Sequence, residues 1–200
     1  MTVVGLVLAG GRAERLGYPK QLLPYRGMTL LEWVVKQVCR ATALDQVLVV
    51  LRTGLVPWAE QHAWDCAILV PVDEPTNGCS ASYRAGIARV AAAAEAVVVV
   101  PGDQVGVCPE VIDRLVGAWR QERTPLALVR YRGDVGHPLL FGRPLFEELM
   151  ALRGDKAAWK LVDRRLHEAL VLEVDGPAPG DIDTWADYWA VLGGDVEPVT

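Results

Sequence analysis

The chain has 200 residues, of which 52% are apolar and 22% are charged, a length and composition that suit one compact domain with a sizeable buried core. Two full domains would be cramped, so we expect a single domain over residues 1–200. The formal net charge of -5 provides no broad cationic surface, which argues against a nucleic-acid partner.

Short β-branched runs alternate with amphipathic segments along most of the chain. The runs that predict strands are 3–9, 46–51, 67–72, 97–101, 126–131 and 170–174. The segments that predict helices are 30–41, 56–64, 80–94, 109–121, 144–151, 157–167 and 185–192. This alternation predicts an α/β fold with a Rossmann-like, doubly wound, mostly parallel sheet and helices on both faces. Ligands of such sheets bind at the carboxyl ends of the strands, so the residues after each strand are the site candidates.

The remaining bulk features concern location and cysteine chemistry. The first apolar run has no basic leader and continues directly into glycines, and the longest later apolar run is interrupted by a glutamate. We therefore expect a cytoplasmic protein without a membrane partner. The cysteines are widely spaced with no C-x-x-C element, which predicts reduced thiols that bind no metal. They are Cys39, Cys66, Cys79 and Cys108.

A loop rich in glycine and basic residues follows the first predicted strand. Gly10 and Gly11 let backbone N–H groups approach an anion, while Arg15 and Lys20 supply positive charge for a triphosphate. The alternative is an ordinary strand-to-helix turn with solvated basic side chains. A Walker loop is disfavoured because no Ser or Thr follows Lys20, and a nicotinamide dehydrogenase is disfavoured because the G-x-G-x-x-G pattern is absent.

The run LAGGRAERLGYPKQLLP, residues 8–24, resembles the signature of the MobA-like nucleotidyltransferases. Within that family it is most similar to the molybdenum cofactor cytidylyltransferases, although Ala13 stands where Ser is usual. The resemblance implies that Arg15 and Lys20 bind the triphosphate and act in catalysis. It also implies nucleotide contacts at Leu8, Ala9, Gly10, Gly11, Arg12 and, after a later strand, Gly102.

Asp103 follows the predicted strand 97–101 and so lies at the strand end beside the first loop. Mg²⁺ is typically held by one or two carboxylates together with substrate phosphates, which makes Asp103 the leading metal ligand and a catalytic candidate. A helix cap is the ordinary alternative for an aspartate here. The segment is similar to the family's G-D-x-P, with Val105 in place of Pro.

The segment 181–188 resembles the family's D-I-D-T-P-x-D-Y motif, with Trp185 in place of Pro. The resemblance implies a second metal carboxylate, Asp181 or Asp183. We expect only one of the two to face the site, and the choice stays open. Thr184 is also a good N-cap for the last helix, and a purely structural segment is the alternative.

The segment 77–82 opens a predicted helix after the third strand. By resemblance, Asn77, Gly78, Ser80 and Ser82 contact the base and ribose, and a helix N-terminus also favours anions. The ordinary interpretation is an Asn-Gly turn with Ser80 as N-cap, and both can hold together.

Two further segments resemble the family's acceptor-binding motifs. Gly136, His137 and Pro138 match G-H-P-x-L-F, and we expect His137, in a loop, to bind substrate rather than transfer a proton. Asp155 belongs to a segment similar to G-D-x-G-[AL]-R, where Ala157 and Trp159 replace the second Gly and the Arg. A tryptophan offers stacking but no bidentate charge, so the acceptor side departs from the family.

The resemblance implies a Mg²⁺-dependent enzyme that transfers CMP from CTP to the phosphate of molybdopterin and releases pyrophosphate. The partners would be the nucleoside triphosphate, the molybdopterin-type acceptor and a molybdoenzyme or its chaperone. Gly10 and Gly11 favour guanylyl-transferring relatives, whereas residues 20–24, residues 77–82 and the G-H-P segment favour cytidylyl ones. The alternatives are a guanylyltransferase that uses GTP on molybdopterin or another small phosphorylated acceptor, and a non-catalytic carrier of the cofactor or a nucleotide.

Overall fold

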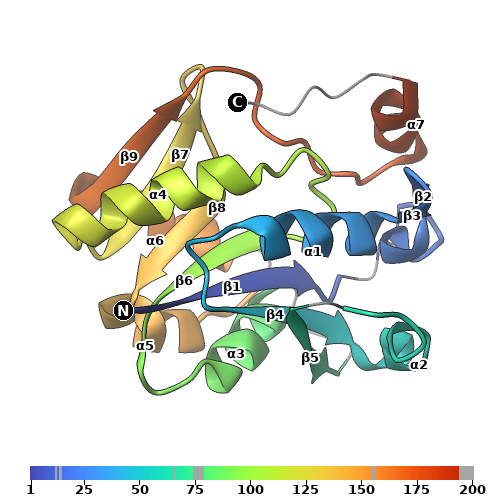
Figure 1. The fold of residues 1–200 in the computed structure, drawn as a ribbon, viewed down its shortest axis with the longest axis horizontal. Helices are drawn as coiled ribbons and strands as arrows, with labels where there is room; N and C mark the ends of the chain where they lie inside the picture. Colours follow the sequence, from blue (N-terminus) through green and yellow to red (C-terminus); the bar gives the residue numbers. More distant parts are fainter. Residues whose placement is uncertain (12, 14, 65, 74–78, 155, 194–200) are drawn as a thin grey trace.

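The computed structural model describes all residues except 12, 14, 65, 74–78, 155 and 194–200. Its main feature is a seven-stranded sheet of order β5-β4-β1-β6-β8-β7-β9 (Figure 1). All neighbouring strands are parallel except β8, which runs antiparallel to both β6 and β7. The strands are β1 Thr2–Ala9, β4 Gln46–Arg52, β5 Ala67–Val72, β6 Ala94–Pro101, β7 Leu126–Tyr131, β8 Asp134–Gly142 and β9 Ala169–Val174. A separate two-stranded hairpin joins β2 Pro24–Tyr25 to β3 Met28–Thr29.

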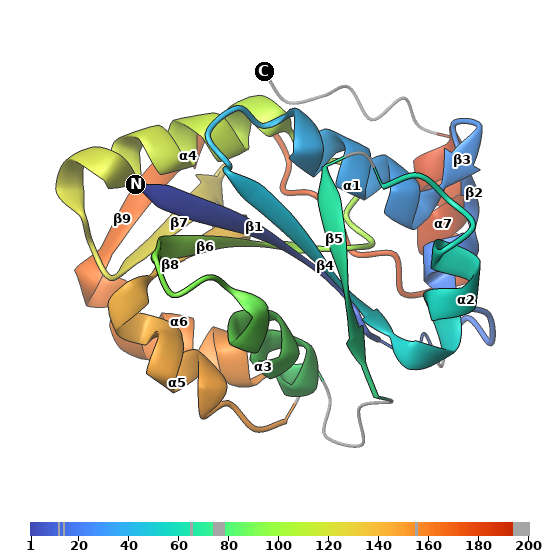
Figure 2. The ribbon, with the colours of Figure 1, turned by 60° about the horizontal axis from the view of Figure 1, so that its bottom comes forward.

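The helices cover both faces of this sheet. They are α1 Leu30–Arg40, α2 Val56–Ala59, α3 Ser80–Arg89, α4 Pro109–Glu122, α5 Phe146–Met150, α6 Ala157–Arg165 and α7 Trp185–Gly193. Short 3-10 turns are η1 Lys20–Leu22, η2 Thr53–Leu55, η3 Arg143–Leu145 and η4 Leu166–Glu168. Figure 2 shows α1 and α4 over one face and α3, α5 and α6 over the other. The predicted mostly parallel α/β fold is confirmed.

The central strand β6 is packed against helices on both faces of the sheet. Val98 and Val100 are fully buried with residues of α1 and α4, whereas Val97 and Val99 are fully buried with residues of α3 and α6. A strand buried on both faces reads as a continuous apolar run, because each alternate side chain meets its own layer of helices. None of the helices in the described part of the chain has the length and apolar character needed to span a bilayer.

Strand β8 was missed by the sequence prediction, which placed a loop around His137. Gly136 and Pro138 both lower β propensity, and Pro138 cannot donate to a ladder. In the structure the β7–β8 register jumps from the pair Leu128–Leu139 to the pair Val129–Gly136. His137 and Pro138, joined by a cis peptide bond, therefore form an irregularity in the strand beside the sheet's carboxyl edge.

Two predicted helices are shorter than expected. Helix α3 ends at Arg89 rather than residue 94, because Ala94 already pairs with Thr2 as the start of β6. Residues 56–64 form only one turn of α-helix, Val56–Ala59, after η2. The segment 144–151 likewise divides into η3 and α5.

The prediction of reduced thiols is wrong for two of the four cysteines. Cys39, near the end of α1, forms a disulfide with Cys66, just before β5. The pair is 27 residues apart, and no short motif joins the two positions. Only the packing of α1 against the neighbouring sheet edge brings the sulfur atoms together. Cys79 and Cys108 keep their thiol groups.

Candidate active site

A cavity of about 260 Å³ lies where β1 and β6 end, on the side of the sheet covered by α3 and α6. This position matches the expected location of ligands in open α/β sheets. Its walls consist of Leu8, Ala9, Gly10, Gly11, Lys20, Gln21, Cys79, Ser82, Tyr83, Pro101, Gly102, Asp103, His137, Ala158, Trp159, Asp181 and Asp183. The structure thus brings together most of the residues that the sequence nominated.

The other nominated residues either lie outside the described part of the chain or do not line the cavity. Arg12, Asn77, Gly78 and Asp155 lie outside the described residues. Gly136 and Pro138 flank His137 in β8 but are not among the residues that line the cavity. Ser80 is fully buried and is the first residue of α3, so the expectation that it is the N-cap is wrong; the N-cap is Cys79.

The glycine loop passes very close to the start of α3. A Cβ atom on Gly10 would lie 2.3 Å from Oγ of Ser82 and 3.1 Å from a methyl carbon of Val72. Only glycine allows this approach, because a side chain would displace buried neighbours. The loop backbone, Ser82 and the α3 N-terminus therefore form one continuous wall of the cavity.

Gln21 holds the loop in place, a role that the sequence analysis did not assign. Its Nε2 donates hydrogen bonds to the carbonyl oxygens of Ala9, at 2.8 Å, and Gly11, at 3.2 Å. These contacts tie the loop carbonyls to η1. The signal available in the sequence was the position of Gln21, directly after Lys20 within the family-like run.

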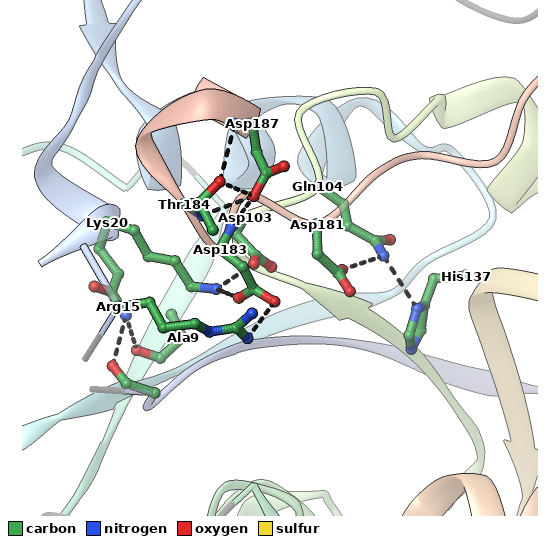
Figure 3. A network of polar contacts seen from close by, with 12 residues as sticks. Ala9, Arg15, Lys20, Asp103, Gln104, His137, Asp181, Asp183, Thr184 and Asp187 are labelled. Atoms are coloured by element: carbon green, nitrogen blue, oxygen red, sulfur yellow. Dashed lines mark hydrogen bonds and ion pairs between the residues drawn. The ribbon is translucent and has the colours of Figure 1, made fainter. Parts of the chain in front are cut away.

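A cluster of opposite charges forms the second wall (Figure 3). Lys20 donates a short hydrogen bond to Asp103 and another of 3.1 Å to Asp183. Arg15 pairs with the other oxygen of Asp183 at 2.7 Å. Lys20, Asp103 and Asp183 come from η1, the loop after β6 and the segment before α7, so three distant parts of the chain meet here.

Burial sets the electrostatics of this cluster. It raises the pKa of Asp103, a shift that Lys20 opposes and Asp181 increases. Burial also disfavours the charge on Lys20, but the carboxylates of Asp103 and Asp183 outweigh it and raise the pKa of Lys20. The negative charge of Asp103 therefore depends on a nearby cation, a need that Lys20 meets.

Both Asp181 and Asp183 line the cavity, so the expectation that only one faces the site is wrong. Ile182 between them is fully buried in the core. In an extended segment, alternate residues share a face, so burial of Ile182 turns both aspartates toward the cavity. They have different partners, because Asp183 joins Lys20 and Arg15 while Asp181 accepts a 2.8 Å hydrogen bond from Gln104.

Thr184 caps the last helix as expected. Its Oγ1 accepts from the backbone of Asp187 at 3.2 Å, while the carboxylate of Asp187 accepts from the backbone of Thr184 at 2.7 Å. The same carboxylate also accepts from the backbone of Asp183 at 3.1 Å. This reciprocal cap fixes the segment that carries the two cavity aspartates.

The third wall is formed by β8 and α6. His137 is buried, and burial lowers its pKa to about 4, so the imidazole is neutral at pH 7. The Tyr131 hydroxyl donates to the backbone oxygen of His137 at 2.7 Å. Trp159 meets the imidazole edge-on, with ring centroids 5.4 Å apart. This wall is neutral and aromatic, in contrast to the charged cluster opposite.

Asp103 and Asp183 form the best donor set for a metal ion, since both accept from Lys20 and therefore lie close together. No group of three or more His, Cys, Asp or Glu side chains within the described ranges could hold a metal by itself. Two carboxylates suit Mg²⁺, which takes its other ligands from water and phosphate oxygens.

Comparisons with known proteins agree with this architecture. A family model described as MobA-like NTP transferase domain matches residues 5–170. A crystal structure of Rv0371c from Mycobacterium tuberculosis H37Rv superposes with a TM-score of 0.87 at 39% identity, covering 97% of this chain and 100% of that chain. A complex of Rv0371c with manganese gives a TM-score of 0.84 at 36% identity with the same coverage of 97% and 100%.

Two curated proteins extend the comparison. The nicotine blue oxidoreductase of Paenarthrobacter nicotinovorans is 33% identical over 203 residues, covering 95% of this chain and 96% of that protein. A probable molybdenum cofactor guanylyltransferase of Thermococcus kodakarensis is 28% identical over 137 residues, covering 68% of this chain and 64% of that protein. The chain therefore belongs to the MobA-like NTP transferase family and is a nucleotidyltransferase of this type.

Proposed function

We propose that the protein transfers CMP from CTP to the phosphate of a molybdopterin-type acceptor, with Mg²⁺ as cofactor and pyrophosphate as leaving group. The observation that carries this proposal is the position of Lys20 between Asp103 and Asp183, in a cavity that the glycine loop also lines. Phosphoryl-transfer chemistry needs positioning and charge stabilisation more than a covalent intermediate, and this cavity provides both.

In this proposal the glycine loop binds the nucleotide, and Lys20 and Arg15 bind the triphosphate. Leu8, Ala9, Gly10, Gly11, Ser82 and Gly102 line the cavity, where a phosphate or base can approach them. When bound to Asp103 and Asp183, Mg²⁺ supplies positive charge that neutralises the phosphates. Lys20 and Arg15, now paired with the same carboxylates, then stabilise charge on the transferred and leaving groups.

The acceptor is proposed to bind at the neutral wall. His137 and Trp159 line this side of the cavity. The family motif would place an arginine at position 159, where this chain has a tryptophan. We extend the acceptor site to Gly136, Pro138 and Asp155 on the resemblance alone. The neutral aromatic lining suits the flat ring system of such an acceptor. A molybdoenzyme or its chaperone would receive the product.

GTP is the alternative donor. The Thermococcus kodakarensis relative is named a probable molybdenum cofactor guanylyltransferase, and Gly10 with Gly11 favours that base. Gln21, which fixes the loop carbonyls, and the G-H-P segment belong to the features that favour CTP. Base choice is therefore a matter for direct competition between the two nucleotides.

The test is pyrophosphate release from CTP or GTP with Mg²⁺ and freshly prepared molybdenum cofactor. Pyrophosphate release with CTP supports the proposal. Release with GTP and not with CTP would show that GTP is the nucleotide donor. Asp103→Asn is expected to lower turnover about 100-fold or more, because a metal contributes several kcal/mol of charge stabilisation. Asp163→Asn, an exposed change on α6, is the matched control and should leave turnover unchanged.

Two other outcomes would contradict catalysis of this transfer. Thermal stabilisation by a nucleotide without pyrophosphate release would support the non-catalytic carrier. This alternative is considered because Ala157 and Trp159 replace the Gly and Arg of the family motif. Consumption of NADH or NADPH with an oxidised substrate would support a redox activity, a second candidate raised by the name of the Paenarthrobacter nicotinovorans relative. The absence of G-x-G-x-x-G after the first strand argues against a nicotinamide site.

A further inference from the structure

Gln104 joins two walls of the cavity through one amide group. The residue directly follows Asp103 and is buried, with 5% of its surface exposed. Its Nε2 lies 2.8 Å from Oδ1 of Asp181 and 3.4 Å from Nδ1 of His137 (Figure 3). The three residues come from the loop after β6, the segment before α7 and strand β8. The amide of Gln104 therefore links these three segments to one another.

The chemistry of Asp181 fixes the orientation of this amide. The carboxylate oxygen of Asp181 accepts a hydrogen bond that only the NH₂ group of Gln104 can donate, so this group, and not the amide oxygen, faces Asp181. Oε1 of Gln104 is then buried without a hydrogen-bond partner among the described residues. A buried acceptor without a partner is unfavourable, so the retained orientation indicates that its two donors are needed where they are.

The same amide determines which nitrogen of His137 carries the proton. One N–H of the NH₂ group is used by Asp181, and the other points to Nδ1 of His137. Nδ1 must therefore accept, which places the proton of the neutral imidazole on Nε2. Figure 3 shows the other ring nitrogen on the side of the imidazole away from Gln104. His137 lines the cavity, so its ring acts there as a hydrogen-bond donor.

We propose that Gln104 is a positioning residue that fixes His137 as the Nε2–H tautomer and orients the carboxylate of Asp181. The inference rests on the proposed function, in which this wall binds the acceptor. His137 then offers a donor and Asp181 an acceptor to the cavity, which the flat indole of Trp159 also lines. This combination suits a planar heterocycle whose edge carries both a hydrogen-bond acceptor and an N–H group.

The test is ¹⁵N NMR of the histidine side chains in the full chain at pH 7. The protein has three histidines, and a His137→Asn sample assigns the signals of His137 by difference. We expect wild-type His137 to show a pyrrole-type, protonated Nε2 and a pyridine-type Nδ1. This measurement needs no variant of Gln104, so it decides the tautomer even if such a variant fails to fold.

Gln104→Glu gives the discriminating variant. A carboxyl group carries at most one proton, which cannot serve both Asp181 and His137, so Nδ1 of His137 is expected to gain a proton and donate. Gln104→Met removes both donors and is expected to abolish the single fixed tautomer. Gln37→Met is the matched control, since Gln37 is buried in α1, bonds to Arg40 and should leave the His137 signals unchanged.

The kinetic readout uses the molybdenum cofactor as probe. Gln104→Glu should raise the KM for the cofactor about tenfold, the size of one lost hydrogen bond to a charged or fixed group, and leave the KM for CTP within about twofold. A wild-type Nδ1–H tautomer, or unchanged His137 signals in Gln104→Glu, would overturn the proposal. If the cofactor is not a substrate but the tautomer result holds, the proposed function fails and the role of Gln104 stands.

Discussion

Lys20 donates a hydrogen bond to the buried carboxylate of Asp103, a residue that follows it by 83 positions. The same ammonium reaches Asp183, so one cation neutralises two carboxylates in the cavity wall. Two carboxylates that accept from the same ammonium repel each other, and the cation between them offsets this repulsion. Lys20 therefore occupies the place where a divalent metal ion would also be most favourable.

The first prediction concerns Lys20→Met. Loss of the ammonium leaves Asp103 and Asp183 without their shared cation, so we expect Mn²⁺ to bind about tenfold more tightly in the absence of nucleotide, a change of about 1.4 kcal/mol. Binding of CTP should weaken by at least a similar factor, because the triphosphate loses a cationic partner. Mn²⁺ affinity can be followed by electron paramagnetic resonance, with and without CTP.

The control for this experiment is Lys36→Met, which removes an exposed lysine from α1. It should change neither Mn²⁺ nor CTP binding by more than about twofold, since surface charges act weakly over distance. Equal Mn²⁺ affinity in wild type and Lys20→Met would show that the two carboxylates do not form the metal site.

The second prediction is a pH dependence of stability that comes from His137. Burial lowers its folded-state pKa to about 4, whereas an unfolded histidine titrates near 6.5. Between these values the unfolded chain binds a proton that the folded chain does not, so stability falls as pH falls from 6.5 to 4. The loss attributable to His137 is about 3 kcal/mol over this window.

Urea unfolding of wild type and His137→Asn at several pH values isolates this effect. The difference in unfolding free energy between the two proteins should be constant above pH 7. It should shrink toward pH 4, because the wild type loses the stability that comes from its neutral, buried His137. Parallel curves for the two proteins would mean that His137 titrates normally in the folded state.

The third prediction compares two helical glycines. A Cβ atom on Gly86 of α3 would lie 2.5 Å and 2.8 Å from the terminal carbons of Leu6, which is fully buried in β1. Gly86→Ala should therefore destabilise the protein by about 1–3 kcal/mol through overpacking, lowering Tm by roughly 3–10 °C. Thermal unfolding measured by circular dichroism gives this shift.

Gly117→Ala is its counterpart in α4, where an added Cβ would meet no atom within 4 Å. Alanine is the better helix former by about 0.5–1 kcal/mol, so this variant should gain stability. If both substitutions shift Tm in the same direction, contact with Leu6 is not what requires glycine at position 86.

The fourth prediction concerns the disulfide between Cys39 and Cys66. The bond closes a loop across 27 residues, which constrains the unfolded chain and contributes about 3 kcal/mol in the chain-entropy model. Replacing both cysteines with serine should lower Tm by roughly 6–12 °C. A thiol titration of the denatured protein should detect two thiols without reductant and four with it.

Cys79→Ser provides the reference for this pair, because Cys79 keeps its thiol and lies at the cavity. Its substitution should leave Tm nearly unchanged, and the number of thiols should fall by one. Four reactive thiols in the untreated, denatured wild type would rule out the disulfide in the protein as prepared.

The sequence predicted those parts of the protein in which local pattern decides the structure. The valine run of β6 marked a strand buried on both faces, and the glycine-rich loop with Lys20 marked residues that line the cavity. Asp103 could be placed because a residue directly after a central strand has few alternatives to the sheet's carboxyl edge. Residues close in sequence share such a signal, since helix and strand periods repeat over a few positions.

Other features depended on pairing between distant segments. The pairing of β8 with β6, the Cys39–Cys66 bond and the bridge by Gln104 each join positions far apart in the chain. Gly136 and Pro138 concealed β8, because their intrinsic preferences oppose the strand that tertiary pairing imposes. No local pattern encodes such contacts.

The two aspartates before α7 show the division most clearly. By itself, the sequence determined that Asp181 and Asp183 follow the last strand and that Thr184 caps the helix after them. Only the tertiary structure decided their separate partners, Gln104 for Asp181 and Lys20 for Asp183. The physical reason is that burial of Ile182 turns both carboxylates toward one cavity. There each carboxylate accepts from a different donor, and each donor comes from another part of the chain.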